Sequence, residues 1–107
     1  MSVEDQGIID IMSFEPKTNK VILTISNHLD WKDELNHLYL LQEKVNSYIS
    51  FYESGQLYRL EPSYKGKEIV IRVSNKYPPT QLVNTFYMAA TRTLESIGIS
   101  LEVEYSH

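Results

Sequence analysis

The stretch from His28 to Gly55 constrains the fold most, because it predicts one long amphipathic helix. Apolar side chains recur along it in alternating steps of three and four residues, which is the period of a helix with one buried face. Polar side chains occupy the opposite face, as expected of a face in solvent. The apolar stripe comprises Trp31, Leu35, Leu38, Leu41, Val45, Tyr48, Ile49 and Tyr52.

Residues at both ends of this stretch favour helix termini. Asp30 is expected to be the N-cap, because its carboxylate can accept hydrogen bonds from the free amides of the first turn. Asp33 and Glu34 then lie at the positive end of the helix dipole. Gly55 suits the left-handed residue that closes a helix.

Shorter patterns predict the elements around the long helix. Alternating or β-branched runs indicate strands over 8–14, 20–26, 67–75 and 99–105, and a second apolar stripe indicates a helix over 80–97. The segment 56–66 is expected to be a packed loop anchored by Leu57, Tyr58 and Leu60, with a short strand as the alternative.

The predicted order of elements is β-β-α-β-α-β, which defines the fold class. Strands with one polar face and helices with one apolar stripe fit an α+β two-layer sandwich. Both helices are expected to cover one face of a four-stranded sheet. Residues 1–107 are expected to form a single domain, with 1–7 frayed.

Composition excludes several classes of function. The chain of 107 residues has no cysteine, which excludes disulfides, cysteine-ligated zinc, iron–sulfur clusters and thiol catalysis. Its net charge of −4 disfavours nucleic acid and anionic membrane as partners, because both require a concentrated positive field. The first ten residues do not resemble a signal peptide, and no apolar run approaches the roughly 18 residues of a membrane span. We therefore expect a soluble, cytoplasmic protein.

His28 and Asp30 are the residues that most resemble a catalytic pair. They lie two residues apart where a strand leads into a helix, which suits a histidine–carboxylate pair for proton transfer. The alternative is that Asp30 caps the helix and His28 is only its neighbour. Capping is the usual role of an aspartate at such a position.

Motifs for metals and cofactors are missing from the sequence. His28, His37 and His107 have no spacing typical of a metal site. Gly66 and Lys67 lack the rest of a phosphate-binding loop, and neither GxGxxG nor GxSxG occurs. The sequence therefore predicts no metal, no cofactor and no catalytic constellation.

Eight tyrosines exceed what so small a core requires. Tyrosine combines a large contact area with a polar tip and is enriched at protein interfaces. Tyr58, Tyr64 and Tyr77 lie near a basic segment, and Tyr39 adjoins Leu40 on the polar side of the long helix. We expect these five residues to form contact surfaces; the alternative is that the tyrosines line the edge of the core.

The chain resembles a family of short bacterial proteins classed as a domain of unknown function. The resemblance is carried by the segment HLDWKDELNHLYLLQEKVNSYISFYESGQL, together with VILTIS before it and KGKEIVIRV after it. The shared pieces are a strand followed by HLDW, a helix with LLQEK at its centre and the ending ESGQL. The resemblance implies a single-domain, cytoplasmic bacterial protein. It assigns no catalytic role to any residue.

Two hypotheses about function follow from the sequence. The first is a non-enzymatic protein that acts by binding another protein, in a regulatory or immunity-like role, or by binding a second copy of itself. The second is an enzyme or small-ligand binder with a pocket near His28, Asp30 and the 56–66 loop. The second requires a cavity with convergent polar groups at that place.

Overall fold

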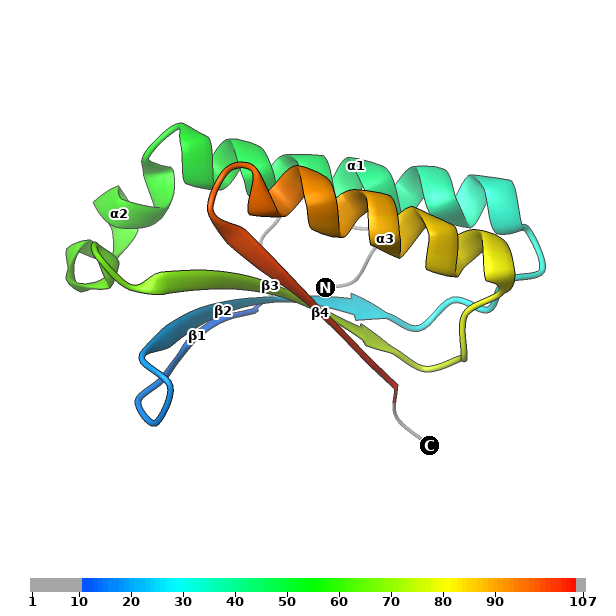
Figure 1. Ribbon diagram of the computed structural model, residues 1–107, viewed down its shortest axis with the longest axis horizontal. Coiled ribbons are helices and arrows are strands. Elements are labelled where there is room, and N and C mark those ends of the chain that lie inside the picture. The colour runs from blue at the N-terminus through cyan, green and yellow to red at the C-terminus, as the bar shows by residue number, and fades with distance from the viewer. Residues whose placement is uncertain (1–10, 106–107) are drawn as a thin grey trace.

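The computed structural model describes residues 11–105, in which two long helices cover one face of a four-stranded sheet (Figure 1). The predicted order and the two-layer α+β architecture are confirmed. The elements are β1 (Ile11–Glu15), β2 (Lys20–Asn27), α1 (Glu34–Glu53), α2 (Gln56–Leu60), the 3-10 helix η1 (Pro62–Tyr64), β3 (Glu68–Asn75), α3 (Gln81–Glu95) and β4 (Ile99–Tyr105).

The sheet has the strand order β1-β2-β3-β4 and is mixed. β1 and β2 form an antiparallel hairpin, and its turn contains Asn19 at a φ of 58°. Asparagine tolerates this left-handed conformation better than most residues. β2, β3 and β4 are parallel, with α1 and α3 in the connections between them. In the register of β2 and β3, Lys20 pairs with Glu68 and Asn27 with Asn75.

The core lies between the sheet and the two long helices. Alternate residues of β2 and β3 point toward the helices, because side chains alternate across a strand. They meet the buried sides of α1 and α3, and all of these side chains are at most 6% exposed. The central members of this core are Val21, Leu23, Ile25, Ile69, Ile71, Val73, Leu41, Val45, Tyr48, Val83, Tyr87 and Leu94.

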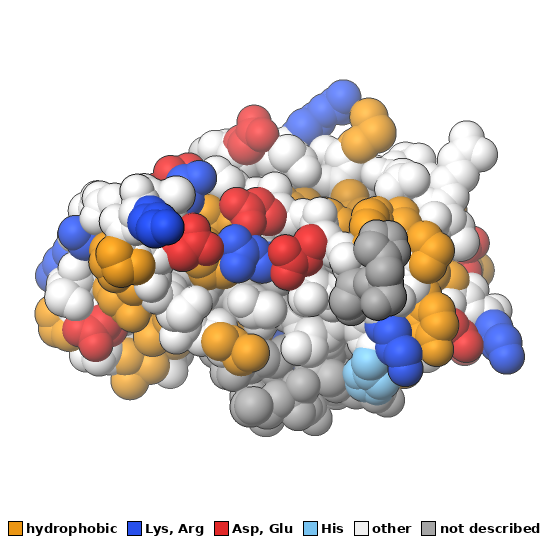
Figure 2. All heavy atoms as spheres, turned by 90° about the horizontal axis from the view of Figure 1, so that it is seen from below, with side chains coloured by type: hydrophobic (Ala, Val, Ile, Leu, Met, Phe, Trp, Pro, Cys, Tyr) orange, Lys and Arg blue, Asp and Glu red, His pale blue; other side chains and the backbone are white. Residues whose placement is uncertain are grey.

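The other face of the sheet carries a cluster of ion pairs around Arg72. Its guanidinium lies 2.8 Å from Glu102, 3.1 Å from Glu15 and 3.9 Å from Glu104. Figure 2 shows acidic and basic side chains gathered side by side on this face. Arg72 therefore connects the middle of the sheet to both edge strands.

The long helix begins later than the sequence predicts, at Glu34, and its N-cap is Asp33. The prediction that Asp30 caps it is wrong. The carboxylate of Asp30 instead accepts a hydrogen bond from the backbone N–H of Lys32 at 3.1 Å, inside the turn that precedes the helix. At the other end Gly55 has a φ of 80°, which confirms its predicted left-handed conformation.

The buried stripe of α1 is rotated relative to the prediction. Its buried residues are His37, Leu41, Lys44, Val45, Tyr48 and Phe51. Leu35, assigned to the stripe, is 75% exposed, and Leu40, assigned to the polar face, packs partly against the core. Both assignments are wrong because the apolar side chains of this helix span more than one face. The sheet contacts the face centred on Leu41 and Tyr48.

Residues 56–60 and 62–64 are helical, so the prediction of a loop or short strand over 56–66 is wrong. The left-handed Gly55 separates α1 from α2, and Pro62 opens η1. Leu57 is completely buried and anchors α2 to the core. Leu60, predicted as a second anchor, is 63% exposed.

Some predictions concern residues outside the described range. The first residues of the strand predicted over 8–14 lie there, as does the segment 1–7 that was expected to be frayed. Between residues 11 and 105, no helix is long and apolar enough to cross a membrane.

Two leucines in α2 test whether Leu57 is buried and Leu60 exposed. Leu57→Ala is expected to lower the free energy of unfolding by about 2–5 kcal/mol, because it deletes a buried side chain and leaves a cavity. Leu60→Ala is the matched control, since it changes the same residue type in the same helix at an exposed position. Its expected effect is within about 0.5 kcal/mol. Urea unfolding measures both, and equal losses would contradict the assigned burial.

Candidate functional site

α1 and α3 run in the same direction, and both begin above the carboxyl ends of the parallel strands (Figure 1). Thr80 connects their first turns. Its hydroxyl oxygen accepts a hydrogen bond from the backbone N–H of Val83 at 3.2 Å, which caps α3. The same hydroxyl donates to the carboxylate of Glu34 in α1. The two helix starts are therefore held together by side-chain contacts.

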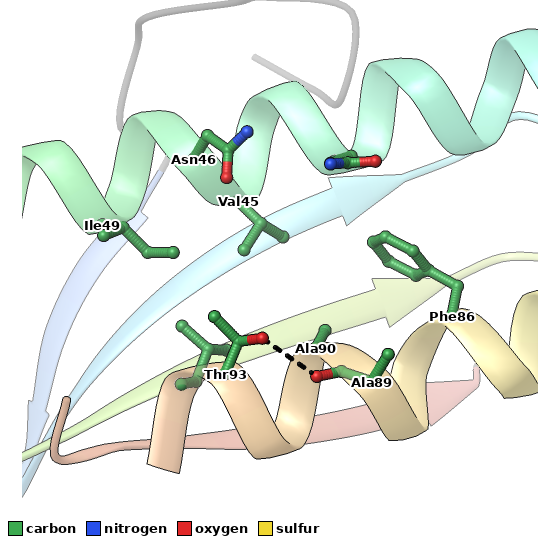
Figure 3. Close-up of a pocket in the computed structure, with 9 residues that line it drawn as sticks. Val45, Asn46, Ile49, Phe86, Ala89, Ala90 and Thr93 are labelled. Carbon is green, nitrogen blue, oxygen red and sulfur yellow. Dashed lines mark hydrogen bonds between the residues drawn. The ribbon is translucent and has the colours of Figure 1, made fainter. Parts of the chain in front are cut away.

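A groove of about 230 Å³ separates the two helices along their middle turns (Figure 3). No charged side chain lines it, and most of the lining is apolar. We call it the interhelical groove. Its lining consists of Gln42, Val45, Asn46 and Ile49 from α1 and Phe86, Ala89, Ala90, Thr93 and Leu94 from α3.

Small residues on α3 keep the groove open. Ala89 and Ala90 extend little beyond the helix backbone, and Phe86 borders them one turn earlier (Figure 3). The hydroxyl of Thr93 donates to the carbonyl of Ala89 at 3.2 Å, so its hydrogen-bonding capacity is used within the helix. This wall therefore presents mainly methyl groups and one aromatic ring.

Large exposed apolar side chains lie on the groove side of both helices. Leu35 and Tyr39 lie on the side of α1 that faces the groove, at positions that lead by steps of three and four to Gln42. Leu82 precedes Phe86 by one turn on α3. Their exposures are 75%, 61% and 44%. Large exposed apolar side chains beside a groove are typical of an interaction site.

A buried polar network lies at the carboxyl ends of the parallel strands. The Asn27 amide donates to Asn75 Oδ1 at 2.7 Å, and the Tyr87 hydroxyl donates to the same oxygen at 3.1 Å. Asn75 Nδ2 donates to the carbonyl of Glu104 at 3.2 Å. The three network side chains are at most 6% exposed. The network therefore joins three strands and α3.

His37 extends this network to α1. Its ring is 2% exposed and stacks on Trp31, with 3.7 Å between the ring centroids. Its Nε2 lies 2.5 Å from Asn27 Oδ1, and its Nδ1 lies 2.8 Å from the carbonyl oxygen of Asp30. Sequence reasoning missed His37 as a buried polar residue. The available signal was its position one turn before Leu41 on the buried face.

The predicted pair of His28 and Asp30 is exposed, and the Asp30 carboxylate is engaged by the backbone of Lys32. The predicted pocket requires this pair and the 56–66 segment to lie together, but they lie at opposite ends of the parallel strands. His28 follows the end of β2, whereas 56–66 precedes the start of β3, and the two strands are parallel. Seven residue steps of a strand, roughly 23 Å, separate these ends.

The tyrosines of the predicted interface lie in different places. Tyr58 and Tyr64 are half-buried, and they pack against Tyr52 and Phe14 with ring centroids 6.3 and 6.0 Å apart. Burial raises the pKa of Tyr58. Tyr77 is 40% exposed and follows the opposite end of β3. The structure therefore does not bring Tyr58, Tyr64 and Tyr77 together, whereas it places Tyr39 beside the groove.

The groove lining lacks the groups that a catalytic site needs. None of its nine residues is a carboxylate, histidine, lysine or tyrosine. Among residues 11–105, no group of three or more histidine, aspartate and glutamate side chains could hold a metal ion. The groove lining therefore offers apolar contact area, two amide side chains and one hydroxyl.

The fold and the groove define a small α+β protein with a two-layer sandwich and an apolar interhelical groove. Comparison with protein families assigns it further: the model of a family of unknown function, DUF6572, matches residues 1–107, so the chain belongs to this family. Neither the curated proteins nor the solved structures that were compared with the chain include a match.

Tyr87 makes the buried network sensitive to high pH. Burial raises the pKa of Tyr87 to about 12, although its hydrogen bond to Asn75 acts in the opposite direction. The folded protein therefore binds this proton more tightly than the unfolded chain, in which tyrosine titrates near about 10. The resulting stabilisation is complete below pH of about 10 and is lost as the pH rises through about 12.

Between these pH values the free energy of unfolding is expected to fall by about 2–3 kcal/mol more for the wild type than for Tyr87→Phe. Tyr77→Phe is the matched control at an exposed position. Its free energy of unfolding should change with pH as that of the wild type does. Urea unfolding at several pH values measures the slopes. Parallel curves for the wild type and Tyr87→Phe would contradict the prediction.

Proposed function

We propose that this chain is a non-enzymatic protein that acts by binding another protein through the interhelical groove. The observation that carries the proposal is the exposure of Leu35, Tyr39 and Leu82 beside an uncharged, largely apolar groove. Large apolar side chains at the rim of a concave surface provide contact area that a partner can remove from water. We also propose that the protein is bacterial and cytoplasmic, as the family resemblance implies.

The partner that best fits the groove is the apolar face of an amphipathic helix. Such helices bind hydrophobic grooves through anchors spaced three and four residues apart. Ala89 and Ala90 allow the backbone of a partner helix to approach closely, because their side chains are short. Gln42 and Asn46 provide amide groups at the groove for polar atoms of the partner.

The size of the groove favours a protein partner over a small molecule. Its volume of about 230 Å³ lies below the roughly 300–1,000 Å³ of typical small-molecule pockets. A partner helix needs only to insert side chains and can extend over Leu35 and Tyr39 beyond the groove. The same surface can also bind a helix of a second copy, which is the homo-oligomeric form of the proposal.

Charge gives a further expectation about the partner. The groove is uncharged, whereas the whole chain carries −4. A partner with an apolar face and basic flanking residues therefore suits this protein better than an acidic one, because opposite net charges speed association. We expect neither nucleic acid nor membrane lipid as the partner, since both prefer a positive surface.

Two neighbouring substitutions on α3 test the proposal. Ala89→Arg places a long charged side chain in the groove and is expected to weaken partner binding at least tenfold, because the charge would be buried against apolar surface. Met88→Arg is the matched control, because Met88 is 62% exposed and does not line the groove. Neither change removes a buried side chain.

The measurement is affinity capture from the native host, read by quantitative mass spectrometry with all three chains as bait. A protein retained by the wild type and Met88→Arg but lost by Ala89→Arg supports the proposal. Sedimentation equilibrium of the same chains detects a homodimer that Ala89→Arg dissociates. A monomeric wild type with no partner sensitive to Ala89→Arg would refute groove binding.

A further inference from the structure

Three buried side chains connect two backbone carbonyls through four hydrogen-bond contacts. The contacts run from Asp30 O to His37 Nδ1 (2.8 Å), from His37 Nε2 to Asn27 Oδ1 (2.5 Å), from Asn27 Nδ2 to Asn75 Oδ1 (2.7 Å) and from Asn75 Nδ2 to Glu104 O (3.2 Å). His37, Asn27 and Asn75 are each 2% exposed. Buried polar groups of this kind need partners within the protein.

Counting hydrogens along this chain of contacts fixes the protonation of His37. Each contact needs one hydrogen, and the carbonyls at the two ends supply none. Each asparagine supplies one, because its oxygen occupies one contact and its nitrogen the other. A neutral imidazole also supplies one, whichever tautomer it adopts. Neutral His37 therefore leaves four contacts with three hydrogens, whereas an imidazolium provides the fourth.

Reorienting the asparagine amides does not remove the deficit. If Asn27 is turned alone, its oxygen faces Asn75 Oδ1 across the contact that is 2.7 Å long. If both amides are turned, the oxygen of Asn75 faces the carbonyls of Glu104 and Val73 at 3.2 and 3.4 Å. Every neutral arrangement therefore brings two acceptors together, and only the protonated ring satisfies all four contacts.

Burial opposes a charged ring, because the low-polarity interior disfavours the ionised form. Two features of the site offset this cost. Charge-assisted hydrogen bonds are stronger than neutral ones, and the ring makes two with neutral oxygens. The indole of Trp31 stacks on the ring at 3.7 Å and an interplanar angle of 17°. An aromatic face attracts a cation in this position.

Other charged groups lie on the elements around the network. Within residues 11–105 the ionisable groups near it include His28, Asp30, Lys32, Asp33, Glu34 and Lys44 on α1 and the segment before it, Lys76 after β3, Tyr87 on α3, and Glu104 and Tyr105 on β4. The Asp30 carboxylate accepts from the backbone of Lys32, and that of Glu34 from Thr80. The Glu104 carboxylate lies 3.9 Å from Arg72. The two oxygens that accept from His37 are neutral.

We propose that His37 is a buried proton-binding site, at which an imidazolium ties the first turns of α1 to the ends of β2 and β3. Loss of the proton leaves one contact between two acceptors and weakens the attachment of α1 to the sheet. The folded protein therefore binds the proton more tightly than the unfolded chain, whose histidines titrate near about 6.5. The stabilisation is complete below that pH and is lost as the pH rises through the titration of the folded state.

Nitrogen NMR of the intact chain labelled with ¹⁵N-histidine tests the protonation directly. At about pH 7.5, one unit above the ordinary histidine value, His37 is expected to show two protonated ring nitrogens. The ring nitrogens of the exposed His28 provide the internal comparison. His28→Gln and His107→Gln assign the remaining signal to His37, because each removes the signals of one other histidine. A single protonated ring nitrogen on His37 at about pH 7.5 would overturn the proposal.

Stability supplies an independent readout. Between pH of about 6.5 and 9, the folding equilibrium constant of the wild type is expected to fall at least tenfold more than that of His37→Gln. Glutamine supplies no titratable proton, and His28→Gln should reproduce the wild-type dependence. Equal pH dependence in the wild type and His37→Gln would overturn the proposal. If His37→Gln does not fold, the NMR measurement on the wild type decides alone.

Discussion

The hydrogen bond between Asn27 and Asn75 is the interaction on which the arrangement of the two layers depends. It joins the last residues of two adjacent parallel strands inside the protein. Asn27 contacts His37 of α1, and Asn75 contacts Tyr87 of α3 and the backbone of β4. Neither helix can slide along the sheet without leaving a buried polar atom unpaired, and such unpaired atoms are costly. The amide pair therefore fixes where both helices begin.

The strands and α3 could be predicted because their patterns allow one interpretation. Residues alternate in β3, and Val83, Tyr87 and Leu94 recur on α3 at helical spacing and are buried. The start of α1 could not be predicted in this way, because Asp30 and Asp33 are both acceptable caps. Local capping preference does not choose between two aspartates. The turn that brings Asp30 O to His37 depends on tertiary contacts that this preference does not include.

The network and the groove were missed for a related reason. His37 and Lys44 are polar residues on the buried face of α1, so a search for apolar periodicity passes over them. The groove depends on the separation of two helices that are distant in sequence, and neither Ala89 nor Thr93 reveals that separation. The helix at 56–60 was missed because Gly55 ends one helix and begins another, whereas a glycine usually marks only an end.

The error at Leu35 is itself informative about function. Leu35 continues the apolar pattern of α1, yet the sheet covers only the face centred on Leu41 and Tyr48. α1 therefore carries more apolar surface than the two-layer core uses, and the excess lies on the side of the groove. His37 fixes the same turns from the opposite face of the helix, so a rigid attachment to the sheet presents Leu35 and Tyr39. Such an attachment lowers the entropy that a partner must remove on binding, which favours a preformed recognition surface.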